Sequence, residues 1–247
     1  MIVLIRRRNF LFVALLLLLS ITVFGFGFAV DYATPVSGES LTKTVIIDAG
    51  HGGEDPGAVS DYSGLKEKDV NLDIALMVKD LLERSNYKVI LTRDSDKLVY
   101  SEGTSNIIQK RKQDLLRRKQ LMDEGGADIV VSIHLNKFPQ TQYHGAQTFF
   151  PPSSPESQKL ANDIQNSIRL NVDNANQRVA LVKKDQIIIL KNLKTPTVIV
   201  ECGFLSNAEE EKQLCQKDYQ SKLADAIKLG IDGYFSQSNK ATDTPQQ

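Results

Sequence analysis

One short segment limits what this chain can fold into more than any other: an apolar strand that ends in a glycine turn with a histidine. Residues Thr44–Asp48 are β-branched or apolar up to the aspartate, and they are followed by Ala-Gly-His-Gly-Gly. Glycines allow a tight turn and let the backbone approach a ligand closely. An α/β protein presents a metal-binding side chain at the edge of its sheet in this way, so His51 is the first candidate for a functional site.

Two further strand-like segments end in side chains that can bind a metal or carry a proton. Ile129–His134 is an apolar run that ends in the second of only 3 histidines, and Thr197–Glu201 ends in a glutamate. The carboxyl ends of parallel strands meet at one edge of a sheet, where α/β proteins bind their ligands. We therefore group His51, His134 and Glu201 in one predicted catalytic site.

Strand and helix patterns alternate along the whole segment 44–235. The other predicted strands are Lys88–Thr92, Ala146–Phe150 and Ile187–Leu190, and the predicted helices are Val70–Arg84, Lys112–Glu124, Pro155–Leu170, Asn207–Gln216 and Tyr219–Phe235. Such alternation predicts a single α/β domain with a mostly parallel or mixed central sheet and helices on both faces.

The N-terminal residues 1–30 have a different composition from the rest of the chain. Arg6–Arg8 precede an apolar run from Phe10 to Val30, a pattern that indicates export. The run of about 21 residues is long enough to span a bilayer, whereas Gly27-Phe28-Ala29 offers a signal-peptide cleavage site. We predict a membrane anchor or a cleaved signal peptide at 1–30, a polar linker at 31–43 and a flexible tail at 236–247. The domain between them is expected to be exported, either membrane-anchored or secreted.

The charge balance gives no support for nucleic-acid binding, and the cysteine content gives none for a disulfide framework. Acidic and basic residues balance at 30 each, so the net charge does not favour nucleic-acid binding. The 2 cysteines, Cys202 and Cys215, are too few for a disulfide framework. A single disulfide bond between them is possible. Their spacing does not suit a compact pair of zinc ligands.

The residues at the predicted sheet edge suit a catalytic zinc. Such a site needs about three protein ligands and one open position. His51 and His134 supply two imidazoles, and Glu67, just before the first predicted helix, is the best candidate for the third. Glu67 can equally belong to a solvated run of charges with its neighbours. Glu201 is then expected to take a proton from the attacking water and pass it to the leaving nitrogen.

Three other residues have open interpretations. Asp48 is either a hydrogen-bond partner that orients a ligand histidine or only a turn residue at the end of a strand. Arg93 either contacts an anionic substrate or pairs with Asp94 or Asp96. His144 follows no strand, and we predict that it is a loop residue.

Several motifs together resemble one enzyme family. In order, they are DAGHGG, GLKEKD, LTR, SIHLN and VECGFLSN, and they are similar to those of the zinc-dependent N-acetylmuramoyl-L-alanine amidases of bacterial cell walls. The resemblance extends from Thr44 to Phe235. It implies one zinc ion per chain, bound by His51, Glu67 and His134, with Glu201 as the catalytic glutamate. It also matches Asn136 and Arg118 to an asparagine and a structural arginine of the family.

Three shorter segments narrow the resemblance. Ser101–Thr104, Gly145–Phe150 and Ile187–Lys191 are similar to the germination-specific amidases of spore-forming bacteria. These enzymes remove stem peptides from spore-cortex glycan, which prepares muramic acid for conversion to the δ-lactam. The resemblance implies two partners. One is the peptidoglycan glycan strand with its stem peptides, and the other is the membrane, to which the N-terminal segment attaches the chain. The alternatives are a vegetative autolysin, a zinc peptidase that cuts within the stem peptide, and a non-catalytic peptidoglycan-binding domain. The sequence does not indicate whether an accessory protein is needed.

Overall fold

The computed structural model describes residues 42–184, 187–191 and 194–242. The predicted signal or anchor at 1–30 and nearly all of the predicted linker lie outside these residues. No helix among the described residues combines the length and the apolar character needed to cross a membrane.

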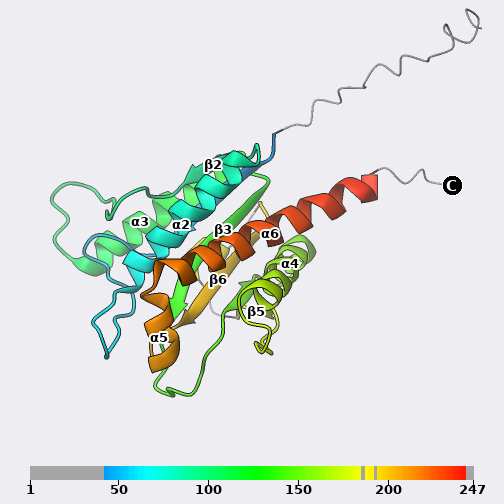
Figure 1. Ribbon diagram of the computed structural model, residues 1–247. Helices are drawn as coiled ribbons and strands as arrows, with labels where there is room; N and C mark the ends of the chain where they lie inside the picture. The colour runs from blue at the N-terminus through cyan, green and yellow to red at the C-terminus, as the bar shows by residue number, and fades with distance from the viewer. Residues whose placement is uncertain (1–41, 185–186, 192–193, 243–247) are drawn as a thin grey trace, which may run out of the picture. The chain divides into compact units, whose positions relative to one another are not determined.

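Within these residues, strands form one mixed sheet of 6 strands in the order β2-β1-β3-β6-β4-β5 (Figure 1). The strands are β1 (Thr44–Ala49), β2 (Lys88–Leu91), β3 (Ile129–Asn136), β4 (Gln147–Phe150), β5 (Leu181–Val182) and β6 (Thr197–Phe204). β2, β1, β3 and β6 are parallel, whereas β4 runs antiparallel to β6 and parallel to β5. The predicted α/β class with a mixed sheet is confirmed.

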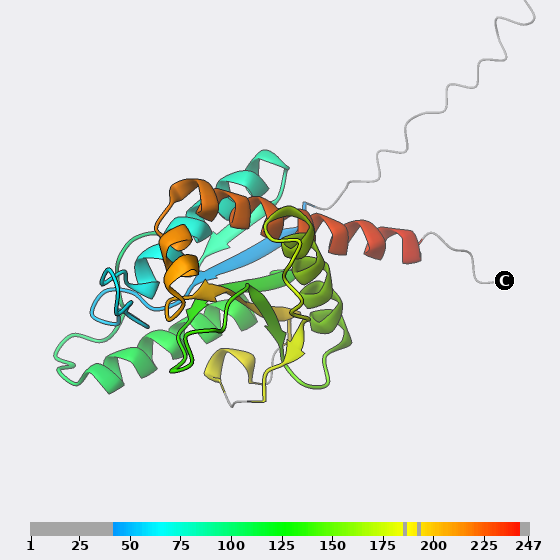
Figure 2. The ribbon, with the colours of Figure 1, turned by 60° about the horizontal axis from the view of Figure 1, so that its bottom comes forward.

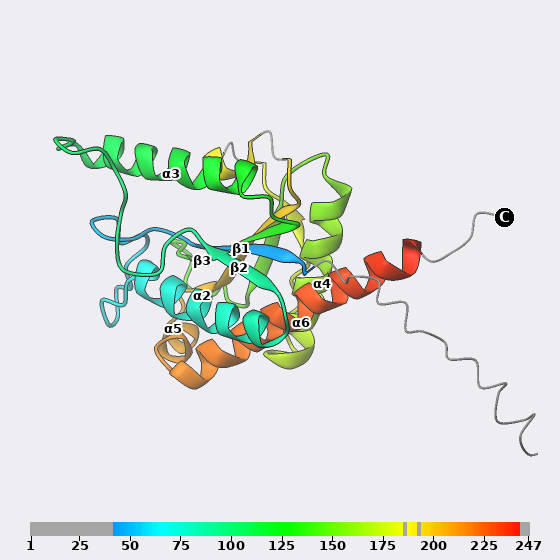
Figure 3. The ribbon, with the colours of Figure 1, turned by 90° about the horizontal axis from the view of Figure 1, so that it is seen from above.

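Helices cover the two faces of the sheet unequally. On one face lie α2 (Glu67–Arg84), α4 (Pro155–Asn171), α5 (Ala208–Leu214) and α6 (Lys217–Thr242). The other face carries α3 (Ile107–Glu124) and the short 3-10 helix η1 (Ile188–Leu190) (Figures 2 and 3). The buried side chains form two clusters, a large one under α2, α4 and α6 and a small one under α3 and η1. The predicted cover on both faces is therefore confirmed.

The alternation of side chains along a strand decides which residues face α3 and η1. Val198, Val200 and Cys202 of β6 belong to the large cluster, whereas Ile199 belongs to the small one. Successive side chains on a strand point to opposite faces, so Glu201 lies on the same face as Ile199. By the same rule, His134 shares the α3 face of β3 with Val130, which is also part of the small cluster.

Several predicted boundaries were wrong. The segment at Ile187–Leu190 is not a strand, because residues 188–190 form η1, whose Ile189 is buried against α3 and Ile199. Periodicity does not distinguish a short apolar strand from a buried helical turn. The two-residue strand β5 was not predicted, and α6 continues to Thr242, beyond the predicted end at Phe235.

Two helices begin earlier than predicted, and one of them, α3, has a side-chain cap before its apolar stripe. α3 begins at Ile107, and the side chain of Asn106 accepts hydrogen bonds from the backbone N–H groups of Ile108 and Gln109. This is the usual role of asparagine at an N-cap. α2 begins at Glu67, which therefore belongs to the first turn of a helix rather than to a loop.

Both cysteines are free thiols. Cys202 is buried in the large cluster, and Cys215 is exposed at the end of α5. The disulfide bond between Cys202 and Cys215, which the sequence allows, is therefore not formed.

Candidate active site

The turn after β1 holds His51 in an uncommon backbone conformation. The φ angle of His51 is 64°, in the left-handed region that non-glycine residues rarely adopt. The guanidinium of Arg118 stabilises this turn, because its Nη2 donates to the carbonyl oxygen of His51 at 2.7 Å. Gly50 lies so close to His134 that a Cβ atom there would stand 2.2 Å from the ring. The glycine is required for this close approach.

Three of the predicted site residues converge at the carboxyl ends of β1 and β3. The Oε1 atom of Glu67 lies 3.3 Å from Nε2 of His51 and 2.9 Å from Nδ1 of His134. One ligand atom from each of these residues lies within 4.8 Å of the other two. The imidazole rings meet edge to face with centroids 5.1 Å apart. The fold thus brings together the two strand-end histidines and the glutamate of α2.

Glu67 is part of the site and not part of a solvated run of charges. Its side chain is buried, with an exposed fraction of only 3%. The backbone N–H of Ala58 donates to Oε2 at 2.8 Å, and the backbone N–H of Leu135 donates to Oε1 at 3.1 Å. A loop at Ala58 and strand β3 at Leu135 therefore fix the carboxylate between the histidines.

The electrostatics of these three residues suit a cation. Burial alone would lower the pKa of His51, but hydrogen bonds and charges from Asp55 and Glu67 outweigh burial and raise the pKa to about 9. Burial opposes ionisation of Glu67, yet the two histidines hold its pKa well below the ordinary value. Positive charge is stabilised at this point. Two imidazoles and one carboxylate are also donors that zinc prefers in catalytic sites, so the residues present fit such an ion.

Asp55 contacts a candidate ligand, and the sequence did not single it out. Its Oδ2 atom lies 2.8 Å from Nδ1 of His51, and its Oδ1 atom pairs with Nη2 of Arg111 at 2.5 Å. An ionised carboxylate only accepts hydrogen bonds, so the proton of His51 is held on Nδ1 and Nε2 is left for a ligand. The signal was a carboxylate four residues after a histidine within one glycine-rich turn.

Asp48 supports the site in a way that neither interpretation of the sequence predicted. It accepts hydrogen bonds from Arg118 at 2.9 Å, from Ser132 at 2.6 Å and from Thr92 at 2.6 Å, and it contacts neither histidine. Arg118 is almost fully buried and also pairs with Asp114 at 2.6 Å. Arg118 is thus structural, as predicted, and it connects α3 to β1 directly beneath His51.

Arg93 has neither of its predicted roles. Its side chain is buried and donates to the backbone carbonyls of Ala49, Gly50 and Lys68 at 2.9, 3.0 and 2.7 Å. The buried guanidinium is occupied by carbonyl groups where the chain turns, and it forms no ion pair with Asp94 or Asp96. His144 lies in a loop, as predicted, and does not belong to the metal-binding group.

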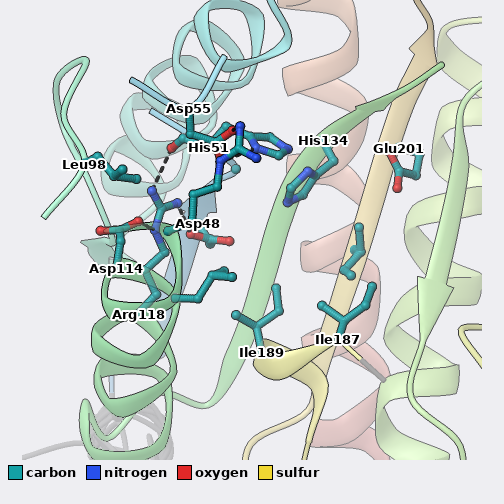
Figure 4. A pocket seen from close by; sticks show the side chains of 14 residues that line it. Asp48, His51, Asp55, Leu98, Asp114, Arg118, His134, Ile187, Ile189 and Glu201 are labelled. Atoms are coloured by element: carbon teal, nitrogen blue, oxygen red, sulfur yellow. Dashed lines mark hydrogen bonds and ion pairs between the residues drawn. The ribbon is translucent and has the colours of Figure 1, made fainter. Parts of the chain in front are cut away.

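Glu201 stands next to His134 on the neighbouring strand (Figure 4). Its exposed fraction is 8%, and its Oε2 atom is buried without a hydrogen-bond partner among the described residues. Burial is the largest influence on this carboxyl and raises its pKa above the ordinary value. Such a carboxyl holds a proton more readily than an exposed one, and its unpartnered oxygen is available to accept and donate a proton.

A cavity of about 310 Å³ opens beside these residues. His51, His134 and Glu201 line one part of it, and apolar side chains of α3, β6 and the η1 segment line another (Figure 4). The apolar residues are Leu115, Ile187, Ile189 and Ile199. A mainly apolar cleft with a few convergent polar groups is typical of a site that binds a small part of a substrate.

Comparison with known proteins identifies the family. The family model described as N-acetylmuramoyl-L-alanine amidase matches residues 45–233. A germination-specific N-acetylmuramoyl-L-alanine amidase of Bacillus subtilis is 36% identical over 206 residues, which cover 83% of this chain and 84% of the relative. The amidase LytC of the same organism is 33% identical over 81% of this chain and 36% of LytC.

A solved structure agrees with the relatives. The CwlD amidase of Clostridioides difficile, determined in complex with the GerS lipoprotein, has a TM-score of 0.77 and 44% sequence identity. The similarity covers 79% of this chain and 100% of that one. With the match over residues 45–233, this chain therefore belongs to the N-acetylmuramoyl-L-alanine amidase family, and its reaction is the hydrolysis of the amide between N-acetylmuramic acid and L-alanine in peptidoglycan.

Proposed function

We propose that the chain performs this hydrolysis as a zinc enzyme, with His51, Glu67 and His134 as the ligands of one zinc ion and Glu201 as the acid–base group. The observation that supports this most is the convergence of three ligand atoms within 4.8 Å of one another. Glu201 lies beside His134 on the neighbouring strand β6, and its buried Oε2 atom has no hydrogen-bond partner in the described part of the chain. A domain that only binds peptidoglycan has no need for this carboxylate.

The residues of the chain divide the work of hydrolysis between them. A zinc ion, when bound, supplies Lewis acidity that polarises the amide carbonyl and acidifies the attacking water. Glu201 takes the proton of that water on its free Oε2 atom. It then delivers the proton to the nitrogen of L-alanine, which leaves as a neutral amine. The raised pKa of Glu201, caused mainly by burial, suits both steps because the carboxyl must gain and lose the proton in one turnover.

Other residues keep the ligands in place. Asp55 holds the His51 ring through Nδ1, and the backbone N–H groups of Ala58 and Leu135 hold the Glu67 carboxylate. Arg118 fixes the carbonyl of His51 from below. This support maintains ligand geometry, which in metal sites is as important as the ligands themselves.

The reaction is tested on purified peptidoglycan. The full chain is incubated with the polymer, and the soluble products are identified by mass spectrometry. We expect stem peptides that begin with a free L-alanine, released from glycan strands that keep their muramic acid. A chelator should stop the release and added zinc should restore it. Fragments cut within the stem would instead show a peptidase.

We further propose that the natural substrate is spore-cortex peptidoglycan and that the product is the precursor of muramic δ-lactam. The similarity to a germination-specific amidase over 84% of that protein supports this assignment. The similarity to LytC supports a vegetative amidase as the second candidate. Cortex and vegetative peptidoglycan offered side by side to the enzyme distinguish the two.

The cellular setting of the enzyme is also proposed. Its relatives are cell-wall amidases, which implies that this chain faces the wall. Residues 1–30 are expected to anchor or export it, although they lie outside the described residues. Because CwlD was solved with the lipoprotein GerS, a lipoprotein at the membrane surface is a candidate partner for this chain. Co-purification from sporulating cells tests that association.

A further inference from the structure

A second group of functional side chains lies on the side of Glu201 that faces away from the histidines. β6 separates β3 from β4, and Glu201 pairs with His134 on β3 and with Gln147 on β4. Side chains that are directly paired across neighbouring strands share one face of the sheet. Gln147 and His134 therefore flank Glu201 on the face that also carries α3 and η1. Nη1 of Arg178 donates to Oε1 of Gln147 at 2.9 Å, which brings a guanidinium to this side of the site.

Arg178 is held in a fixed orientation. Its Nε donates to the carbonyl of His144 at 2.6 Å, and its guanidinium carbon lies 4.6 Å from the ring centroid of Phe204. Phe204 itself is buried at the end of β6. Within the described part of the chain, Nη2 of Arg178 makes no hydrogen bond. One arm of this planar, preorganised guanidinium is thus available to an acceptor that the described residues do not supply.

No acidic side chain of the described residues forms an ion pair with this guanidinium. Glu210 is the carboxylate whose charge acts most strongly on Arg178. Its two oxygens accept hydrogen bonds from the backbone N–H groups of Gly145 and Phe204, both at 2.8 Å. Glu210 therefore fixes the loop and the end of β6, and it leaves the guanidinium to an external anion.

A second cation stands on the same side of Glu201. The backbone N–H of Lys183 donates to the carbonyl of Phe150 at 2.8 Å, and its ammonium lies 4.6 Å from the ring centroid of Phe149. Phe149 is two residues after Gln147 and shares its face of β4. The positive charge of Lys183 also opposes the rise in the pKa of Glu201 that burial causes. The ammonium of Lys183 is therefore close enough to Glu201 to act on its carboxyl group.

Resting on the proposed function, in which the two histidines are zinc ligands and Glu201 acts on the scissile amide, we propose that Arg178 binds a carboxylate of the stem peptide. A stem peptide carries such a group at least at its C-terminus. Guanidinium groups bind carboxylates through charge-assisted hydrogen bonds, which are stronger than neutral ones. The peptide side of the substrate then extends from the amide across β4, and the enzyme distinguishes anionic stems from neutral ones.

The test compares two muramoyl peptides with the full-length, zinc-loaded enzyme. One has a natural stem with its carboxylates free, and the other has the same stem with every carboxylate converted to a carboxamide. We expect the wild type to show a roughly tenfold higher kcat/KM for the free carboxylates, the scale of one charge-assisted contact. Arg178→Gln should lose that preference through KM, with unchanged zinc content and unchanged kcat/KM on the carboxamide. Arg178→Lys should keep part of the preference.

Lys184→Gln is the matched control, because it removes a positive charge one residue from Lys183 and Lys184 is exposed. It should keep the full preference for free carboxylates. Equal kcat/KM of the wild type on the two substrates would overturn the carboxylate site while the amidase function stands. An equal loss on both substrates in Arg178→Gln would also overturn it, because the arginine would then be structural. Cleavage of neither substrate by the wild type would overturn the proposed function itself.

Discussion

Nδ1 of His51 lies 2.8 Å from Oδ2 of Asp55, and this one contact decides which nitrogen of the ring faces the site. With Nδ1 occupied, Nε2 points to Glu67 at 3.3 Å. Arg111 on α3 holds the other oxygen of Asp55. The aspartate thus connects a helix on the outside of the domain to a candidate zinc ligand.

The first prediction concerns this contact. Asp55→Asn should weaken zinc binding by roughly 10- to 100-fold, the usual effect of removing a hydrogen-bond partner of a ligand histidine. The dissociation constant is measured by competition with a chromophoric chelator. Asp94→Asn, an exposed aspartate that pairs with Lys97 away from the site, should bind zinc as the wild type does. Unchanged affinity in Asp55→Asn would mean that other contacts orient the ring.

The second prediction concerns the ligand set. The purified chain should hold one zinc ion, as measured by elemental analysis, because a site with three protein ligands binds zinc tightly. His51→Ala, His134→Ala and Glu67→Gln should each lose the metal and the activity. His144→Ala is the control, since this loop histidine lies outside the metal-binding group. Full zinc content in any of the first three variants would remove that residue from the set.

The ligand positions were predictable from the sequence because their cause is local. A strand that ends in a glycine turn places the next side chain at the sheet edge, and parallel strands collect these ends together. His51 and His134 followed from this rule alone. Glu67 was the best candidate for the third position from the residues alone, but most of its support came from the family resemblance, because its sequence neighbours form a run of charges.

The supporting residues were not predictable in the same way. Nothing in the sequence around Arg93 indicates that it is buried, and the structural role of Arg118 was implied only by the family resemblance. Both are almost fully buried because they satisfy carbonyl and carboxylate groups around the turn. The contact of Arg178 with Gln147 lies near Glu201 only because β4 runs antiparallel to β6 and places Gln147 opposite Glu201. Such contacts depend on strand order and register, which one sequence without relatives does not specify.

The third prediction separates the role of Glu201 from that of a ligand. Glu201→Gln should keep the zinc content of the wild type and lose at least about 10²-fold in kcat, the usual contribution of general acid–base catalysis. Glu209→Gln, an exposed glutamate on α5, should retain full turnover. Loss of zinc in Glu201→Gln would make this residue a ligand and would reopen the role of Glu67.

The fourth prediction concerns stability and pH. Burial raises the pKa of Asp48, but Arg118, Ser132 and Thr92 outweigh burial and lower the pKa from 3.8 to about 2. A lowered folded-state pKa stabilises the fold above the unfolded value and loses this effect as the pH falls through the folded value. Asp48→Asn should therefore reduce the free energy of unfolding by about 2 kcal/mol at neutral pH.

The difference between wild type and Asp48→Asn should shrink as the pH falls from about 4 to about 2, the interval between the two pKa values. Denaturant titrations at a series of pH values measure it. Asp80→Asn, an exposed residue of α2, should match the wild type throughout. A constant difference at all pH values would mean that the ionised carboxylate is not the source of the stabilisation.

The last prediction tests the proposed cortex role, which implies that the organism encoding this chain forms spores. Removal of stem peptides must precede lactam formation, because the lactyl carboxyl is blocked until the amide is cut. Deleting the gene should therefore leave vegetative growth nearly normal, while the spores contain no muramic δ-lactam and complete germination poorly. Chromatography of digested cortex measures the lactam. The wild-type gene should restore it and Glu201→Gln should not, although the variant protein is present. Normal δ-lactam in the deletion strain would contradict the cortex assignment and leave the zinc amidase chemistry to be explained by a vegetative substrate.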